Sequence, residues 1–402
     1  MPTSAAPAQA IAPGTHTTVL LLSGGAFFSG AALRICDSLL PRLAADFHLT
    51  AGIAGLVIIG FSICYGLSQL VFGPLGDRYG KARLVSIALF GCTAGSLACA
   101  LAPSFAALVG ARGIWGIAAA GVIPLSMAWI GDAVPYEQRQ ATLARLLTGT
   151  LAGMMGGQLA GGLFADSALG WRGAFSTMAA GYATVAILLA ARVRRLPPAI
   201  AAGGVRPTFA AQLLSVLRTG WARAVLAAGL AEGMFLLGPM AYLPAYLHQR
   251  FGLSLSLASA LLVLYAVGGL VYSMSARHIL RRFGERRMVW AGGLLMGGGY
   301  FAWWISPLAL AAGPIALLVG FGTYLFHNTL QTHATQMVPA ARGTAVALFA
   351  FCLFFGQAIG VSLAGYAFDH IGAALVLLTP ALALPLTGWV FSAAMHRRSR
   401  AA

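Results

Sequence analysis

Charged residues are scarce in this chain of 402 residues. Only 8% of its residues are Asp, Glu, Lys or Arg, whereas 59% are hydrophobic. Soluble domains carry about 25% charged residues, and a water-soluble protein of this length could not hide so much apolar surface. The composition therefore excludes an ordinary soluble domain and indicates a protein embedded in a membrane.

Acidic residues are the rarest charged class, with nine Asp and Glu against 25 Lys and Arg, so the formal net charge is +16. Most of the Lys and Arg residues fall in the segments that share one side when the apolar runs alternate across a bilayer. This is the positive-inside bias of cytoplasmic segments. The basic charge therefore predicts topology, with both termini in the cytoplasm, rather than a nucleic-acid partner. We expect a multi-pass protein of the bacterial inner membrane.

Signatures of several other protein classes are missing from the sequence. The five cysteines lie in apolar runs without CxxC pairs or His/Cys clusters, and we interpret them as small buried hydrophobes. There is no nucleophile motif, metal-ligand cluster or phosphate-binding loop, which argues against an enzyme, a metal site and a cofactor. Residues 1–17 lack the basic region of a signal peptide, and we expect them to form a disordered tail.

Twelve apolar runs of helical length follow this tail, and each approaches or exceeds the roughly 18 residues that cross a bilayer. They are expected near residues 18–41, 52–72, 84–102, 105–131, 141–165, 172–191, 222–247, 253–276, 288–306, 312–337, 343–368 and 372–395. The polar stretch 192–221 is the expected cytoplasmic linker, with a short amphipathic helix near 212–218. The linker separates an N-terminal half, 18–191, from a C-terminal half, 222–396, which a cytoplasmic tail, 397–402, follows.

The two halves repeat each other. Asp77-Arg78-Tyr79-Gly80 is echoed 204 residues later by Arg281-Arg282-Phe283-Gly284, and Asp166 recurs as Asp369 after 203 residues. The other pairs at similar offsets are Pro41 with Pro244, Phe47 with Phe251, Val134-Pro135 with Val338-Pro339, and Gly157-Gln158 with Gly356-Gln357. Because each half has six spans, both halves have the same orientation in the membrane. The pattern predicts an all-α membrane protein of two parallel six-helix halves, and a transporter with its site between them.

The turn between the second and third runs carries the most specific motif, Gly73-Pro-Leu-Gly-Asp77-Arg78-Tyr-Gly80-Lys81-Ala-Arg83. It resembles the signature loop of the major facilitator superfamily, and the resemblance extends over residues 18–396. It implies that Asp77 lies at the start of span 11, where a helix N-terminus favours a carboxylate. It also implies that Asp132, at the end of span 4, meets Arg78 or Arg83. The residues expected to form this conformational latch are Gly73, Asp77, Arg78, Gly80, Arg83 and Asp132; a solvated loop that only orients the chain is the alternative.

Three further motifs resemble those of the twelve-span drug/sugar–proton antiporter branch. Leu108-x-x-x-Arg112-x-x-Trp115-Gly116 resembles the span 4 motif of proton-coupled members, with Trp115 in place of the usual Gln. Asp37-x-x-x-Pro41-x-x-Ala-x-Asp46-Phe resembles the first span of drug and sugar exporters. Span 5 resembles the glycine-rich antiporter motif, although Gln158 replaces a Pro, and the residues expected to pack helices there are Gly153, Gly157, Gln158 and Gly161. A packing seam without any bearing on transport direction is the alternative for span 5.

Five ionisable residues lie inside the apolar runs, where each is costly and functional by default. They occupy spans 1, 4, 7 and 10 only, and are Arg34, Asp37, Arg112, Glu232 and His327. In the fold that the resemblance implies, these four helices line the central cavity. The embedded charges and the resemblance therefore point to the same place between the halves.

Each embedded residue has an expected role. Arg34 and Asp37 are spaced to pair across one helical turn, either at the substrate site or as a structural ion pair. Glu232 has no basic neighbour in its own span, and its apolar surroundings disfavour the charged form. We therefore predict Glu232 as the proton carrier, with Asp37 as the second candidate; a permanently protonated Glu232 is the alternative. Arg112 is expected to neutralise a carboxylate or to hold an anionic substrate. The other expected cavity residues form a polar patch on span 10, for substrate contact or helix packing: His327, Asn328 and Gln331.

The expected function is proton-coupled efflux of small organic molecules, by rocking of the two halves of a monomer. A proton-coupled importer of a small metabolite is the first alternative, because two embedded arginines and two embedded acids leave the charge of the substrate open. A transport-inactive membrane sensor is the second. The expected partners are the small-molecule substrate, protons and the lipid bilayer.

Overall fold

The computed structural model describes residues 15–194 and 208–401, and the regular elements in these ranges are all helices. The N-half comprises α1 Thr15–Arg34, α2 Leu40–Asp46, α3 Ala51–Ala54, α4 Leu56–Tyr79, α5 Lys81–Ala100, α6 Phe105–Ala119, α7 Val122–Ala133, α8 Tyr136–Ala165 and α9 Gly170–Val193. A short helix, α10 Phe209–Arg218, precedes the C-half. The C-half comprises α11 Gly220–Glu232, the π-helix η1 Gly233–Leu237, α12 Gly238–Met240, α13 Leu243–Phe251, α14 Leu255–Leu262, α15 Leu264–Ile305, η2 Ala309–Ala311, α16 Ala312–Gln336, η3 Pro339–Ala341, α17 Arg342–His370 and α18 Ala373–Ala401.

The described part of the chain contains the twelve expected membrane spans. Ten helical segments are long and apolar enough to cross a membrane. One of them, Leu255–Ile305, has a non-helical residue at Gly284 and contains the expected spans 8 and 9. The expected span 5 is α8, which is 30 residues long and starts with a polar turn at Tyr136. The all-α, twelve-helix architecture that the sequence predicts is therefore confirmed.

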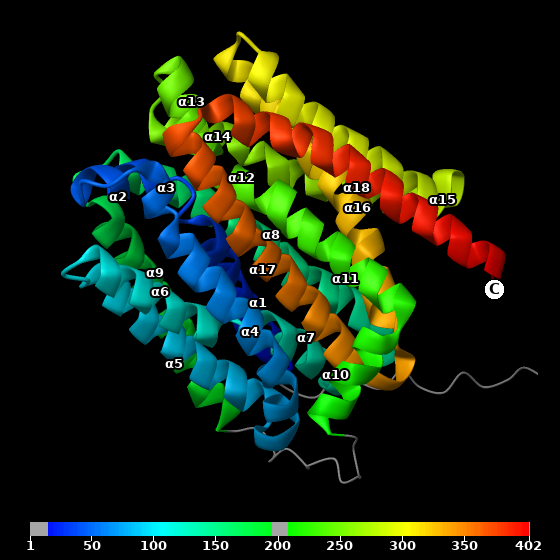
Figure 1. The fold of residues 1–402 in the computed structure, drawn as a ribbon. Coiled ribbons are helices and arrows are strands. Elements are labelled where there is room, and N and C mark those ends of the chain that lie inside the picture. Colours follow the sequence, from blue (N-terminus) through cyan, green and yellow to red (C-terminus); the bar gives the residue numbers. More distant parts are fainter. Residues whose placement is uncertain (1–14, 195–207, 402) are drawn as a thin grey trace, which may run out of the picture.

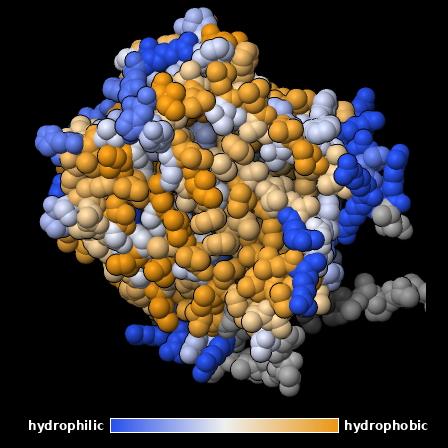
Figure 2. Space-filling model, viewed as in Figure 1, coloured by the Kyte–Doolittle hydropathy of each residue, from blue (hydrophilic) through white to orange (hydrophobic). Residues whose placement is uncertain are grey.

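The two halves are bundles that pack side by side. In Figure 1, α1, α4 and α8 of the N-half and α11 and α17 of the C-half run through the middle of the molecule, and the other long helices cover its two flanks. One hydrophobic core lies around Trp115 and Tyr182 of the N-half and extends across the interface to Tyr242 of the C-half. A second core lies in the C-half, around Tyr300 and Phe326. Figure 2 shows a broad hydrophobic surface with hydrophilic residues gathered toward the ends, as a bundle of spanning helices requires.

The molecule has two ends, which differ in their turns. The Asp166 end holds the turns that follow α2, α8 and α17, with Asp46, Asp166 and Asp369. The Gly80 end holds the turns at Gly80 and Gly284 and helix α10. Because successive spans alternate in direction, each end gathers every second connection of the chain.

The expected loop 73–83 at the Gly80 end is mostly helical, which corrects the sequence-based interpretation. α4 continues to Tyr79 and α5 begins at Lys81, so the chain reverses at Gly80 with a φ of 88°. Gly284 reverses α15 in the same way with a φ of 69°. Glycine adopts these left-handed conformations without steric cost, so the repeated sequence is a repeated turn.

Three segments were expected outside the twelve spans: an N-terminal tail, a linker with one short helix, and a C-terminal tail. The helix expected near 212–218 is present as α10, and its Gln212 accepts a hydrogen bond from the hydroxyl of Thr344 on α17 at 2.6 Å. Residues 1–14 of the expected tail and residues 195–207 of the expected linker lie outside the described residues. At the other end of the chain, α18 continues through the expected tail to Ala401.

Span 1 is not a continuous helix. α1 ends at Arg34, residues 35–39 form turns, and α2 starts at Leu40 with Pro41 in its first turn. Proline cannot donate a backbone hydrogen bond to the preceding turn, which favours a break here. The expected continuous helix over residues 18–41 is therefore interrupted between Arg34 and Leu40, although Arg34 and Asp37 still pair as expected. Asp37 stays close to Arg34 because its backbone N–H donates to the Arg34 carbonyl at 3.2 Å.

Span 7 breaks at the related place in the C-half. The π-helix η1 follows Glu232 directly, and α13 starts only at Leu243. The hydroxyl of Tyr300 donates to the carbonyl oxygen of Leu236 at 2.7 Å, and so pairs a buried carbonyl of the π-helix. π-Helical turns are frequent at functional sites, and broken helices in transporters often line the transport site. The two breaks therefore mark the middle of the molecule as the candidate site.

Glycines hold the broken helices against their neighbours. A Cβ at Gly153, Gly157 or Gly161 of α8 would overlap carbonyl oxygens of α1 and of the turn after it. On α17, a Cβ at Gly356 or Gly360 would overlap carbonyl oxygens of α11 and η1 in the same way. The glycine-rich motif of span 5 thus lies in a close helix contact, and the C-half repeats this contact between spans 7 and 11.

Candidate functional site

A cavity of about 170 Å³ lies between the halves, beside the breaks in spans 1 and 7. The N-half lines it with Leu33, Arg34 and Met154, and the C-half with Glu232, Leu237, Tyr265, Thr323, Tyr324, His327, Leu353, Phe354 and Gln357. A second cavity, of about 30 Å³, shares Arg34, Met154, Tyr265 and Tyr324 with the first. A mostly apolar lining with a few convergent polar groups is typical of small-molecule sites.

Glu232 and His327 meet in the larger cavity. The Nδ1 atom of His327 lies 3.0 Å from each carboxylate oxygen of Glu232, and Glu232 is only 2% exposed. The expectation that Glu232 lacks a basic neighbour therefore holds only within its own span, because α16 brings His327 against the end of α11. An imidazole and a carboxyl group in contact can share a proton and stay hydrogen-bonded in more than one protonation state. The pair is thus able to take up and release a proton inside the molecule.

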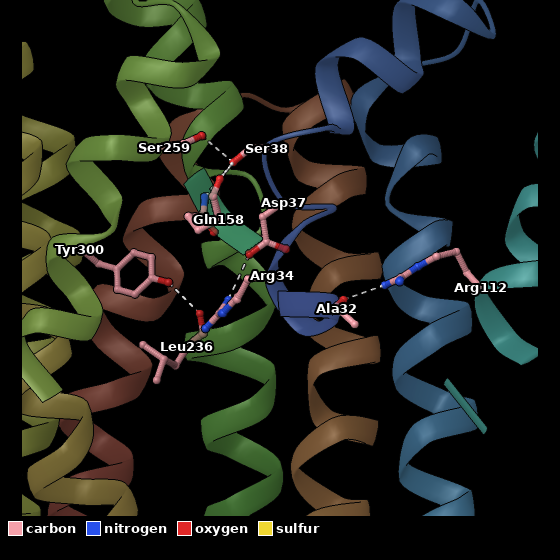
Figure 3. Close-up of polar contacts among 9 residues, drawn as sticks. All are labelled: Ala32, Arg34, Asp37, Ser38, Arg112, Gln158, Leu236, Ser259 and Tyr300. Carbon is pink, nitrogen blue, oxygen red and sulfur yellow. Dashed lines mark hydrogen bonds and ion pairs between the residues drawn. The ribbon is translucent and has the colours of Figure 1, made fainter. Parts of the chain in front are cut away.

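Arg34 and Asp37 form the second charged pair. Nη1 of Arg34 lies 3.1 Å from Oδ2 of Asp37, and the two residues are 6% and 1% exposed. Figure 3 shows the pair beside the break that ends α1. Arg34 lines both cavities, and its guanidinium lies 5.8 Å from the ring centroid of Tyr265 in the C-half. Asp37 lines neither cavity, so its contact with the site is its ion pair with Arg34.

A buried polar link joins the halves next to this ion pair. Gln158 Nε2 donates to the hydroxyl of Ser38 at 2.8 Å, and the hydroxyl of Ser259 in the C-half donates to the same oxygen at 2.7 Å. Figure 3 shows the three side chains converging above Asp37. Gln158, expected only to pack helices, therefore also makes a polar contact. Ser38 and Ser259 were not predicted, because a serine in an apolar run carries no distinctive signal.

Arg112 lies elsewhere in the N-half. It is 1% exposed, and it donates from Nε to the carbonyl of Val57 at 3.2 Å and from Nη2 to that of Ala32 at 3.3 Å. Its guanidinium also covers the rings of Phe61 and Trp115, at 4.1 and 4.8 Å from their centroids. Figure 3 shows Ala32 between Arg34 and Arg112. Arg112 lines neither cavity, and these contacts tie span 4 to spans 1 and 2; its role with a carboxylate or substrate stays a prediction.

The polar patch expected on span 10 is only partly at the cavity. His327 lines it, whereas Asn328 and Gln331 line neither cavity, and Gln331 is exposed. Thr323 and Tyr324 of the same helix, which had no individual predicted role, do line the larger cavity. Helix α16 is rotated so that Thr323, Tyr324 and His327 face the cavity. The sequence alone does not fix this rotation about the helix axis.

The expected latch at the Gly80 end is described only in part. Asp132 forms an ion pair with Lys81, rather than with Arg78 or Arg83 as the resemblance implied. The guanidinium of Arg78 lies 5.3 Å from the ring centroid of its neighbour Tyr79. The side chain of Asp77 lies outside what the structure describes, so its contact with span 11 stays a prediction.

Comparison with known proteins agrees with this architecture. The uncharacterized MFS-type transporter YceJ of Bacillus subtilis (strain 168) is 26% identical over 356 residues, which cover 86% of this chain and 89% of YceJ. The multidrug resistance protein Stp of Mycobacterium tuberculosis (strain CDC 1551 / Oshkosh) is 32% identical over 165 residues, 40% of this chain and 30% of Stp. The crystal structure of the peptide transporter POT in complex with sulfate has the same fold, with a TM-score of 0.79 at 14% identity over 96% of this chain and 95% of that one.

The decisive match is to the family itself. The model of the Major Facilitator Superfamily matches residues 22–361, which run from α1 through most of α17 and include both broken spans and the cavity between them. Twelve spans in two repeated halves is the architecture that this match implies. The chain belongs to the major facilitator superfamily.

Proposed function

We propose that this protein exports small organic molecules across the bacterial inner membrane in exchange for protons, with its Gly80 end in the cytoplasm. The observation that carries the proposal is the contact between His327 and the buried carboxylate of Glu232, in a cavity that both halves line. The orientation rests on the positive-inside rule, because Arg78, Lys81 and Arg83 lie at the Gly80 end.

The depth of the pair suits a site that both sides of the membrane reach in turn. Glu232 is the last residue of α11, which starts at Gly220, so it lies about 18 Å along the helix. The hydrocarbon core of a bilayer is about 30 Å thick, so this position is near its middle. Rocking of two halves about a central site exposes such a group first to one side and then to the other.

Exchange follows if proton and substrate compete for the same pair. A substrate that contacts Glu232, or that separates it from His327, favours loss of the shared proton, and by linkage the proton weakens substrate binding equally. Substrate that binds from the cytoplasm would then release a proton there, and a proton from outside would displace the substrate. The similarity to Stp, a multidrug resistance protein, supports the outward direction.

Transport in everted membrane vesicles tests the proposal. A strain without its own efflux pumps is first screened for resistance to a panel of dyes and antibiotics, including ethidium, which identifies a compound. That compound is then added to vesicles with an acid interior, where a fluorescent amine reports the pH gradient. We expect proton release with the wild-type protein and none with Glu232→Gln. Absence of both resistance and compound-dependent proton flux in the wild type would contradict the proposal.

Proton-coupled import is the second candidate, and one observation favours it. Arg34 lines both cavities, and its Nη2 atom has no hydrogen-bond partner among the described residues. An anion bound there would attract a proton to the nearby Glu232–His327 pair, so anion and proton would travel together. The vesicle experiment separates the two, because symport moves protons and compound in the same direction.

A further inference from the structure

Asp166 joins the two halves at the Asp166 end. It follows α8 of the N-half and accepts hydrogen bonds from the backbone N–H groups of Leu255 at 3.2 Å and of Ser256 at 2.7 Å. The hydroxyl of Ser256 donates to the same carboxylate. Leu255 and Ser256 are the first residues of α14, so a carboxylate of one half caps a helix of the other half. A negative charge at a helix N-terminus is favourable, and bonds to a charged acceptor are strong.

Asp369 makes the reciprocal contact. It lies near the end of α17 in the C-half, and its two carboxylate oxygens accept from the backbone N–H of Gly52 at 3.0 and 3.1 Å. Gly52 lies in α3, at the start of span 2. The close approach needs glycines, because a Cβ at Gly52 would overlap the Asp369 carboxylate and one at Gly365 would lie 2.8 Å from the Gly52 Cα.

The two contacts are copies of each other. Asp166 and Asp369 are 203 residues apart, and their partners Gly52 and Ser256 are 204 residues apart. Each aspartate ends the fifth helix of its half and holds the second helix of the opposite half. We call these four residues with Leu255 the aspartate clasp. A pair of contacts related by the internal repeat acts symmetrically on the two halves, which a chance surface contact would not.

The described hydrogen bonds between the halves gather toward this end. Besides the clasp, the link from Ser259 to Ser38 crosses the interface, and it lies between the clasp and the cavity. The described hydrogen bonds that join the halves therefore lie between the cavity and the Asp166 end.

We propose that Asp166 and Asp369 are gating residues of this transporter: their bonds to the opposite half keep the Asp166 end closed, and they must break before the cavity opens there. The inference goes beyond the proposed function, because it assigns the closure of one entrance to two residues whatever the substrate and coupling ion are. The clasp restrains rotation of the halves and takes no part in proton binding at the cavity.

Spin-label distances at both ends test the clasp. The five native cysteines are replaced by Ala or Ser, and nitroxides are placed on Leu101→Cys with Leu308→Cys, or on Tyr79→Cys with Phe283→Cys. All four positions are exposed; the first pair lies at the Asp166 end and the second at the Gly80 end, with one label in each half. Distances are measured by double electron–electron resonance in lipid nanodiscs, which needs no substrate.

We expect Asp166→Asn and Asp369→Asn each to add a population with a longer Leu101–Leu308 distance and a shorter Tyr79–Phe283 distance. The ratio of this population to the original one should rise about three- to tenfold for each change and further in the double variant. Asp166→Glu should restore part of the original distribution, because it keeps the charge. A double variant that is folded, as judged by gel filtration, but has the parent distance distributions at both ends would overturn the proposal.

Asp46→Asn is the matched control. Asp46 also lies at the Asp166 end, but it accepts from Arg42 at 3.0 Å and from Trp171 at 3.0 Å, both in its own half. We expect its removal to leave both distance distributions unchanged. An equal response of Asp46→Asn would show that any lost charge at this end opens the molecule, and would reject the clasp. Transport assays do not enter this test, so it stands even if the proposed export fails.

Discussion

Glu232 depends on a residue 95 positions later in the chain. Its carboxylate is 2% exposed, and isolated burial of such a charge costs several kcal/mol. His327 relieves this cost by contact with both oxygens. Because an imidazole and a carboxyl group can each donate or accept, the pair keeps a hydrogen bond when it gains or loses a proton. At the residue scale, this contact is the basis for the proposal that the pair carries the coupled proton.

Replacement of the proton carrier is the first prediction at this scale. Glu232→Gln keeps the size of the side chain and a hydrogen bond to His327, but it cannot bind and release a proton. We expect pH-gradient-driven transport to fall at least a hundredfold, while substrate binding persists and loses its pH dependence. Glu232→Asp should retain partial transport with a shifted pH profile. Wild-type accumulation by Glu232→Gln would move the coupling site to Asp37.

The Arg34–Asp37 pair gives the second prediction. Arg34→Ala strands a carboxylate that is 1% exposed, whereas Arg34→Ala with Asp37→Ala removes both charges. Loss of one partner of a buried ion pair typically costs about 3–5 kcal/mol, and loss of both costs far less. We therefore expect the single variant to melt at a lower temperature in detergent than the double variant. A double variant that is stable but inactive would show that the pair acts in transport, and full activity would make it structural only.

Of the five ionisable residues that the sequence marks inside apolar runs, three line the cavity, whereas Asp37 and Arg112 do not. These three are Arg34, Glu232 and His327. The contact between Glu232 and His327 was not predicted, because it depends on how α16 is rotated against α11. Neutral residues such as Tyr265 and Gln357 were not assigned either, because many tyrosines and amides in apolar runs simply pack or pair. The residue types were visible in the sequence, whereas their contacts depend on how the helices pack.

At the scale of elements, glycines decide how close the broken helices come. Gly153 of α8 lies against the carbonyl oxygen of Phe27 on α1, so the two backbones touch. Small residues of this kind are the usual means of helix association in membranes. The closeness of α1 and α8 in turn places Arg34 at the end of a well-fixed helix.

Addition of a single methyl group tests this contact. Gly153→Ala would overlap the Phe27 carbonyl, and overpacking of this kind costs about 1–3 kcal/mol. Gly110→Ala is the matched control, because its Cβ would have no atom within 4 Å, and alanine favours a helix by about 1 kcal/mol over glycine. We expect a lower melting temperature for Gly153→Ala and an equal or higher one for Gly110→Ala. Equal melting temperatures would mean that α1 and α8 can separate at little cost.

The clasp predicts a pH dependence at the Asp166 end. Burial raises the pKa of Asp166, but the hydrogen bonds from the side chain and backbone of Ser256 and from the backbone of Leu255 outweigh it and lower the pKa below its usual range. His248 also lowers this pKa, and Arg42 bonds to the carbonyls on either side of Asp166. A lowered pKa in the closed state means that the charged clasp stabilises closure above the ordinary carboxyl value of about 3.9 and loses this effect as the pH falls further.

Spin-label distances across this pH range provide the measurement. The closed population of the Leu101–Leu308 pair should be constant near neutral pH and should fall only as the pH drops below about 4. Because Asp166 is exposed and solvent screens its charge, we expect a modest shift. Asp166→Asn with Asp369→Asn should remove the dependence. A transition near pH 6 would instead point to a histidine.

At the scale of the whole molecule, the internal repeat connects sequence and fold most directly. The matches at Gly80 and Gly284, and at Asp166 and Asp369, were visible in the sequence and correspond to repeated turns and repeated contacts. Twelve spans in two halves were predictable because each span must satisfy its backbone internally and stay apolar. The conformation was not predictable, because a transporter sequence has to be compatible with several relative positions of its halves.

Opposed contacts at the two ends should set the balance between these positions. If Asp77 fastens the Gly80 end in the other state, as the family resemblance implies, Asp77→Asn should favour the arrangement described here, in which the clasp is formed. The clasp variant Asp369→Asn should shift the balance the opposite way. Because each change alters only the free-energy difference between two states, the combined variant should show distances between those of the single variants. Spin-label pairs at both ends measure this directly. A combined variant that stays as far shifted as Asp369→Asn alone would show that Asp77 fixes topology without holding the halves together.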